Sequence, residues 1–326
     1  MPVGEFELID QYFRPPADKP DGAGVVLGIG DDAAIVEPDP EQQLVVAADT
    51  LVSGVHFPEG ADPEFVGERS LRVNLSDIAA MGATPAWFTL SLTLPQDWSE
   101  QERGDWVAGF SRGLRRVSEA FKCPLIGGDT TSGPLNIAIQ MIAQVPPGQA
   151  LRRDGAAVGD FVLVTHTLGD GAAALASFTD SAVFSDEQRD YLSQRFYCPE
   201  PRIKESVILR ALASSAQDVS DGLLADLGHI CAASDVGAEV DVESLPISAA
   251  AQAPGQAQGR QWALSGGDDY ELVFTLHPDK MPEFAMAQAR GEIQASVIGR
   301  IVAGAGVHCL LDDQPYSVEA EGFRHF

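Results

Sequence analysis

The chain has 326 residues, of which 45% are hydrophobic, a composition typical of a globular protein with two domains or one large domain. Its formal net charge of −27 makes nucleic acid and anionic membranes unfavourable partners, because an acidic surface repels polyanions. The sequence shows neither a secretory signal nor an apolar run of about 18 residues, and its four cysteines form no CxxC pair. We therefore expect a cytoplasmic protein without zinc sites or disulfides.

Apolar, β-branched runs alternate along the chain with stretches of helical apolar spacing, which predicts an α/β fold. Strand-like runs cover residues 43–48, 87–94, 136–145, 161–165, 270–276 and 296–302. Helical spacing runs through residues 1–13, 63–81, 98–121, 203–214, 220–233 and 278–289. The Pro146-Pro147-Gly148 break and the polar stretch after it predict a boundary between domains 1–148 and 149–326.

A subset of the 48 acidic residues lies beside glycines or inside apolar runs, where a solvated charge is not expected. A carboxylate at a strand end faces the sheet edge where many α/β folds bind ligands, and a neighbouring glycine lets backbone N–H groups approach a phosphate. Carboxylates that converge there need cations between them, and oxygen ligands without His or Cys suit Mg²⁺. This pattern predicts a magnesium–phosphate site built from Asp31, Asp32, Asp49, Asp77, Asp129, Asp218, Asp221, Asp268 and Asp269.

Each of these aspartates alone also fits a helix cap or a turn, and Asp218 and Ser220 before a helical run are good candidates for caps. Asp77 fits this alternative poorly, since it lies late in a predicted helix, where an acid opposes the helix dipole. The sequence contains neither a GxxxxGK[ST] loop nor the catalytic loop of protein kinases. In a phosphoryl-transfer enzyme of this type, magnesium would take over the charge neutralisation that lysine supplies elsewhere.

Seven segments follow one another in the order seen in thiamine-monophosphate kinases, a family that the chain resembles from residue 4 to residue 326. They are GEFELIDQYF, GIGDDAA, ADTLVSGVHF, VNLSDIAAMGATP, LIGGDTT, DVSDGLLADLGHI and SGGDDYELVFT. Short motifs such as GIGDD are shared with a wider ATP-binding superfamily that includes aminoimidazole ribonucleotide synthetase, selenophosphate synthetase and a hydrogenase-maturation protein. The longer segments resemble the thiamine-phosphate branch.

The resemblance implies two α/β domains and the last step of thiamine diphosphate biosynthesis. ATP would phosphorylate thiamine monophosphate by direct in-line transfer, with several Mg²⁺ ions bound. The N-terminal domain would contribute a mixed sheet to a barrel at a homodimer interface, where ATP binds. The C-terminal α/β domain would complete the nucleotide and substrate site.

The resemblance also implies roles for individual residues, none of which is a covalent nucleophile or a required general base. The metal ligands would be Asp32, Asp49, Asp77, Asp129, Asp218 and Asp221, with the adjacent Asp31. ATP would contact Gly128, Asp129, Arg153 and Ser220. Thiamine phosphate would contact His56, Asp268 and Phe323.

Two positions depart from the family pattern. Ala47 and Ala48 stand where the family has hydroxyl residues, and Asp268 stands where it has a glutamate, which is one methylene longer. The alternatives are another enzyme of the superfamily and a protein that binds nucleotide without turnover. Selenophosphate synthetases carry a reactive Cys or selenocysteine near the N-terminus and the hydrogenase-maturation type ends in cysteine, whereas here the first cysteine is Cys123 and the last residue is Phe326.

Overall fold

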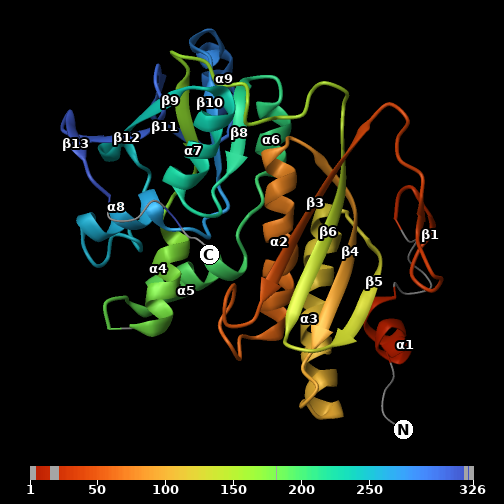
Figure 1. Cartoon of the computed structure of the whole chain (residues 1–326). Coiled ribbons are helices and arrows are strands. Elements are labelled where there is room, and N and C mark those ends of the chain that lie inside the picture. The colour runs from red at the N-terminus through yellow and green to blue at the C-terminus, as the bar shows by residue number, and fades with distance from the viewer. Residues whose placement is uncertain (1–4, 15–21, 181, 319–321, 323–326) are drawn as a thin grey trace. The chain divides into compact units, whose positions relative to one another are not determined.

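The computed structural model describes residues 5–14, 22–180, 182–318 and 322. The chain divides into two compact units (Figure 1). The first unit takes residues 1–78 and 83–148, and the second takes residues 79–82 and 149–326. None of the helices in the described ranges is long and apolar enough to cross a membrane.

The first unit is built on a four-stranded mixed sheet of strand order β3-β6-β4-β5. Its strands are β3 (Gln43–Val52), β4 (Thr84–Leu94), β5 (Leu125–Ser132) and β6 (Asn136–Val145). β4 and β5 run parallel, whereas β6 pairs antiparallel with both β3 and β4. A separate pair, β1 (Val25–Leu27) and β2 (Ile35–Val36), and the short helix α1 (Glu5–Leu8) with its π-helical continuation to Phe13 precede this sheet.

Two helices cover one face of this sheet, α2 (Pro63–Ala80) and α3 (Glu100–Phe121) (Figure 1). They approach each other closely at glycines, since a Cβ on Gly67 would lie 2.2 Å from the Phe110 carbonyl oxygen. Ser99 starts α3 with a capping box, in which its hydroxyl and the Glu102 carboxylate each accept the other residue's backbone N–H. The helices leave the other face of the sheet open, and Leu44 and Val46 on β3 are 49% and 57% exposed there.

The second unit holds a seven-stranded mixed sheet of order β13-β12-β9-β11-β7-β10-β8. Its strands are β7 (Phe161–Thr165), β8 (Ala213–Asp218), β9 (Gly237–Asp241), β10 (Leu272–Leu276), β11 (Ala295–Val302), β12 (Gly306–Leu311) and β13 (Gln314–Tyr316). Its α-helices are α4 (Asp170–Thr179), α5 (Asp186–Tyr197), α6 (Ile203–Leu209), α7 (Leu223–Ser234), α8 (Gln256–Ser265) and α9 (Met281–Ala289).

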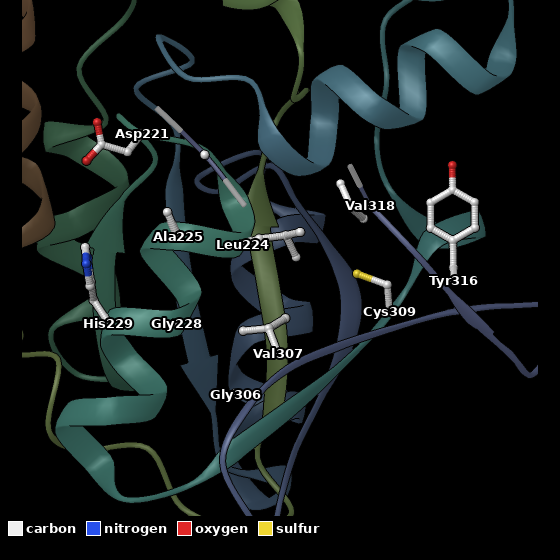
Figure 2. Close-up of a pocket in the computed structure, with 11 residues that line it drawn as sticks. Asp221, Leu224, Ala225, Gly228, His229, Gly306, Val307, Cys309, Tyr316 and Val318 are labelled. Carbon is white, nitrogen blue, oxygen red and sulfur yellow. The ribbon is translucent and has the colours of Figure 1, made fainter. Parts of the chain in front are cut away.

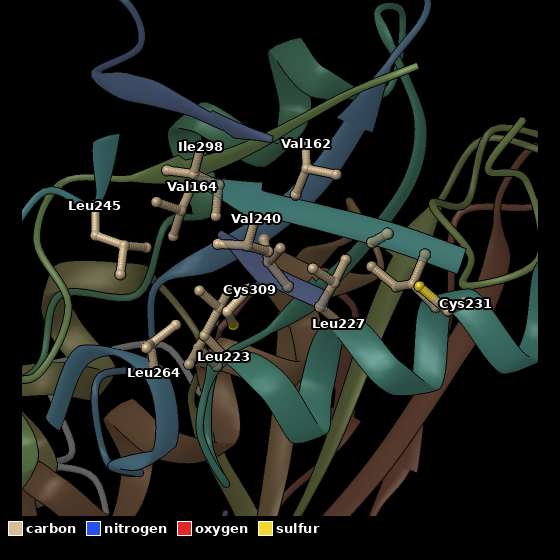
Figure 3. Close-up of a cluster of buried hydrophobic side chains, with 14 of the residues drawn as sticks. Val162, Val164, Leu223, Leu227, Cys231, Val240, Leu245, Leu264, Ile298 and Cys309 are labelled. Carbon is tan, nitrogen blue, oxygen red and sulfur yellow. The ribbon is translucent and has the colours of Figure 1, made fainter. Parts of the chain in front are cut away.

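Helices pack on both faces of this second sheet, because its central strands are buried on both sides. Along β7, Val162 and Val164 join a core that includes Leu223 and Leu227 of α7 (Figure 3). The intervening Leu163 points to the opposite core, which α6 and α9 complete. This alternation is the two-residue period of a strand buried on both faces.

Mixed α/β architecture was predicted and is confirmed, and the described strands form open sheets. The predicted strands at 136–145 and 161–165 coincide with β6 and β7. The helix predicted over 203–214 is wrong at its end. It stops at Leu209, and Ala213 and Ser214 begin β8, which β10 holds in the sheet by backbone pairing.

Candidate active site

The first unit contains a cavity of about 780 Å³ that gathers four of the predicted site residues. Its wall combines the π-helical turn near Phe13, the glycine-rich segment 28–34 and parts of β4 and β5. The predicted residues that line it are Asp31, Asp32, Gly128 and Asp129. These residues come from segments about a hundred positions apart, so the fold unites two of the motifs that the sequence singled out.

Glycine is required at one position of this wall. Gly128 has φ +151°, and a Cβ there would lie 1.8 Å from the carbonyl oxygen of Leu90 on the neighbouring strand. Only a residue without a side chain allows β5 to pair with β4 at this point. The exposed carboxylate of Asp129 follows directly.

Positive charge in this cavity comes from Arg14, the one cation among the described residues that line it. One of its Nη atoms lies 3.1 Å from the Asp10 carboxylate, and both side chains are about half exposed. The guanidinium also lies close above Gly30, since a Cβ on that glycine would be 2.5 Å from it. Sequence reasoning missed Arg14, which stands outside every glycine-rich motif.

A second group of predicted residues lies where β3 meets α2. The backbone N–H of Asp49 donates to Asn74 Oδ1 at 3.2 Å, and this buried amide also donates to the Ser70 carbonyl at 2.8 Å. Asp77 follows Asn74 by three residues, so it lies on the same side of α2. Asp49 and Asp77 are both half-buried, which agrees with their position inside apolar runs of the sequence.

His56 is held just after β3 by two local hydrogen bonds. Its Nδ1 accepts the backbone N–H of Val52 at 3.0 Å, and its carbonyl accepts from Arg69 Nε at 3.2 Å. An accepting Nδ1 places the proton of a neutral ring on Nε2.

In the second unit, β8 ends at Asp218 and the loop from Val219 to Gly222 leads into α7. The predicted caps are wrong here, because the N-cap is Gly222 and neither Asp218 nor Ser220 caps the helix. Asp226, inside the first turn of the helix, instead holds the loop before it: one of its oxygens accepts the backbone N–H groups of residues 220, 221 and 222 at 3.0–3.1 Å. Sequence reasoning missed Asp226, although an aspartate four residues beyond a glycine at a helix start is a usable signal.

The segment from Gly266 to Tyr270 runs beside that loop. The N–H of Asp268 donates to the Ser220 carbonyl at 2.9 Å, and the N–H of Tyr270 donates to the Val219 carbonyl at 2.8 Å. The fold thus brings together the predicted residues Asp218, Ser220, Asp221 and Asp268. Arg153 lies in a bend before β7. This bend runs beside β8, since the carbonyl of the neighbouring Arg152 accepts the N–H of Ala216, and the Arg153 side chain is exposed.

Negative charge accumulates at this loop. Burial, followed by the charge of Asp218, raises the pKa of Asp226 to about 7, although the backbone N–H groups of the loop act in the opposite direction. A cation bound beside these carboxylates would relieve that repulsion. The donors are oxygens throughout, as Mg²⁺ prefers, and Mg²⁺ needs few side chains because it keeps waters and phosphate oxygens. Within the described ranges, no three His, Cys, Asp or Glu side chains form a ready-made metal cage.

A further cavity, of about 500 Å³, opens beside α7 with Asp221 at its edge (Figure 2). Its wall includes small residues of α7 and β12 together with Cys309 and Tyr316. Gly322 also lines it. The predicted substrate residue Phe323 lies outside the described residues.

Comparison with known proteins agrees with the motif order. Residues 30–145 match the family AIR synthase related protein, N-terminal domain, and residues 157–311 match AIR synthase related protein, C-terminal domain. Thiamine-monophosphate kinase of Escherichia coli strain K12 is 43% identical over 330 residues, covering 100% of this chain and 99% of that protein.

Solved structures show the same relationship. The crystal structure of thiamine-monophosphate kinase from Stenotrophomonas maltophilia K279a matches with a TM-score of 0.82 and 46% identity, covering 90% of this chain and 93% of that one. AaThiL complexed with AMPPCP and TMP matches with a TM-score of 0.77 and 32% identity, covering 91% and 92%. By its two domains and its full-length similarity, the chain belongs to the thiamine-monophosphate kinase family.

Proposed function

We propose that this protein transfers the γ-phosphoryl group of ATP to thiamine monophosphate and so forms thiamine diphosphate. The observation that carries the proposal is the cavity of the first unit, where two glycine–aspartate motifs meet in a chain of this family. The relative AaThiL has been solved with AMPPCP, an ATP analogue, together with TMP. The four cysteines are free thiols, which supports a reducing compartment such as the cytoplasm.

The carboxylates are the groups that we propose for binding Mg²⁺. In the first unit they form two groups, Asp31, Asp32 and Asp129 around the cavity and Asp49 and Asp77 at the β3–α2 contact. Asp218 and Asp221 serve the same purpose in the second unit. When bound, Mg²⁺ neutralises phosphate oxygens and orients them for transfer.

The remaining predicted residues bind the two substrates in this proposal. Gly128 offers its backbone to the nucleotide because it has no side chain, and Arg153 and Ser220 contact ATP in the second unit. His56, Asp268 and Phe323 contact thiamine phosphate. The attacking atom is a phosphate oxygen that is already ionised near neutral pH, so the chain supplies position and charge neutralisation and no general base.

We also propose a homodimer in which the four-stranded sheet forms half of a barrel. Leu44 and Val46 support it, since a large apolar side chain on an open sheet face is a usual interface feature. The position of the carboxylates supports it too. β3 and β5 are opposite edges of the sheet, so three strand spacings of about 4.8 Å separate Asp49 from the strand of Asp129 by roughly 14 Å. One metal ion cannot bind both residues of one chain, whereas two chains can bring them together.

Direct measurement of ADP release tests the proposal. Purified protein with Mg²⁺ and ATP is expected to release ADP when thiamine phosphate is added, and not with thiamine or with aminoimidazole ribonucleotide precursors. Mass spectrometry of the product should show thiamine diphosphate. ATP binding without ADP release would instead support a protein that has lost turnover, and ADP release with an aminoimidazole precursor would support another branch of the superfamily.

A further inference from the structure

The segment from Asp268 to Glu271 in the second unit has an unusual backbone. Asp268 has φ +70° and Tyr270 has φ +52°, so two non-glycine residues of one short loop are in the left-handed region. A bulky side chain such as tyrosine seldom adopts that conformation, because its Cβ then crowds the following carbonyl oxygen. Such strain persists only where the surroundings fix the backbone from several sides.

The first anchor of this loop is Asp269, whose side chain is buried. One carboxylate oxygen accepts the N–H of Gly169 at 2.7 Å, and the other accepts the N–H of Gly171 at 3.0 Å. These donors belong to the N-terminus of α4, where backbone N–H groups lack helical partners. The loop is therefore attached to the start of a helix.

The second anchor is Glu271, which is fully buried. Arg202 donates to it through two nitrogens at 2.7 and 2.6 Å, and Arg195 donates at 2.8 Å. The hydroxyl of Thr165 donates to the same carboxylate at 2.5 Å. Paired, charge-assisted bonds of this kind fix geometry strongly in a buried environment.

The two anchors leave Asp268 and Tyr270 facing each other. The Tyr270 hydroxyl donates to Asp268 Oδ1 at 3.1 Å. Glycines on both sides let neighbouring backbone come close, since a Cβ on Gly267 would lie 2.4 Å from the Ser220 carbonyl oxygen and one on Gly171 would lie 2.6 Å from that of Asp268. The position of Asp268 is thus fixed in two ways. Neighbouring backbone packs against the loop on both sides, and the Tyr270 hydroxyl donates a hydrogen bond to the Asp268 carboxylate.

We propose that Tyr270 is a positioning residue that aims the Asp268 carboxylate at thiamine phosphate, within a loop that Asp269 and Glu271 clamp. This inference rests on the proposed function, which assigns the substrate contact to Asp268. The aspartate is one methylene shorter than the glutamate of the family pattern, so it reaches less far and depends more on a fixed orientation. A strained tyrosine next to it supplies that orientation at the cost of an unfavourable backbone angle.

The test compares Tyr270→Phe, Asp268→Asn and the double variant with the wild type. Tyr270→Phe removes one hydrogen bond to a charged group, so we expect the KM for thiamine phosphate to rise about 3- to 10-fold while the KM for ATP and the Tm stay unchanged. In the Asp268→Asn background the same change should add nothing further, because the group that the hydroxyl orients is already altered. Tyr191→Phe is a comparison for the clamp alone, since it removes a hydroxyl that bonds at 2.8 Å to Asp170, which Arg195 links to Glu271, and leaves the bond to Asp268 in place.

The outcomes separate the inference from the function. A wild type that does not phosphorylate thiamine phosphate overturns both. A wild type that does, combined with an unchanged KM in Tyr270→Phe or with equal and independent effects of the two substitutions, overturns the positioning role alone. A rise in both KM values together with a lower Tm would show a general structural role and would also overturn it.

Discussion

Asp49 and Gly128 occupy one row of the four-stranded sheet, Asp49 on the edge strand β3 and Gly128 on the edge strand β5, connected through Ile139 and Leu90. The next residue of β5 is Asp129. In the proposed dimer, an active site that needs both Asp49 and Asp129 at one metal ion would take them from different chains.

Mixing two inactive variants tests this arrangement. Asp49→Asn and Asp129→Asn should each abolish turnover. When the two proteins are mixed and allowed to exchange subunits, half of the dimers are mixed and each has one intact site of two, so roughly a quarter of the wild-type activity should return. If both residues act within one chain, every site carries a substitution and mixing restores nothing.

In the proposed dimer, the open face of the four-stranded sheet is the interface between the two chains. Val46→Asp places a charge on β3 at a position that is 57% exposed, and burying this charge in an interface is unfavourable. We expect the molar mass from light scattering to fall to that of the single 34.6 kDa chain. Turnover should be lost as well, because each active site of the proposed dimer takes residues from both chains. Val158→Asp is the control, because this valine is 61% exposed and lies in the second unit. A variant that stays dimeric would contradict the interface.

Two adjacent glycines of β5, Gly127 and Gly128, allow a matched test of whether the close approach of β5 to β4 shapes the cavity wall. Gly128→Ala forces a Cβ to within 1.8 Å of the Leu90 carbonyl oxygen at φ +151°, so the strand must move. We expect more than about 1 kcal/mol of lost stability and weaker ATP binding by calorimetry. Gly127→Ala is the control, since a Cβ there meets no atom within 4 Å and its φ is not positive. Equal Tm values for the two variants would show that the close approach does not constrain the wall.

The sequence predicted the regular elements best where burial patterns are simple. Residues 136–145 alternate between buried and more exposed positions, and 161–165 form a run of apolar and β-branched residues, so both strands were located to the residue. β8 was missed because its sequence ASSAQD has no β-branched or aromatic residue. Its strand conformation comes from pairing with β10, and such tertiary context overrides local propensity.

The site shows the same division between local pattern and tertiary context. Glycine next to aspartate is a local pattern, and it singled out Gly128 and Asp129, which line the cavity of the first unit. The separation of Asp49 from Asp129 depends on strand order, which places β6 and β4 between them although β6 comes last in the sequence. The motif SGGDDYEL selected Asp269 together with the expected metal-binding acids, but its role as a buried anchor was missed, and Glu271 was not selected at all. Both roles depend on partners that are roughly 70 to 105 residues away in the sequence.

The stability of the second unit should depend on pH through Asp269. Complete burial, followed by the charge of Asp170, raises the pKa of this carboxyl to about 8, whereas an unfolded aspartate has a pKa of about 4. The folded state therefore binds the proton more tightly than the unfolded state. The stability from this group is fully present below about pH 4 and is lost as the pH rises towards about 8. A protonated carboxyl still accepts both N–H bonds through its oxygens, so the anchor persists as the proton is bound.

Asp269→Asn removes this titration. We expect the Tm of the variant minus that of the wild type to become steadily more positive between pH 5 and pH 8.5, even if the variant is less stable at pH 5 because its amide N–H faces a backbone N–H. Calorimetric or fluorescence melts across this pH range, in protein without nucleotide, measure the difference. Asp190→Asn, which changes an exposed aspartate of the same unit, should keep a constant difference from the wild type. Parallel Tm–pH curves for Asp269→Asn and the wild type would mean that Asp269 is already ionised across the range, and its burial would then be compensated by the charge of Arg195 and the two N–H donors.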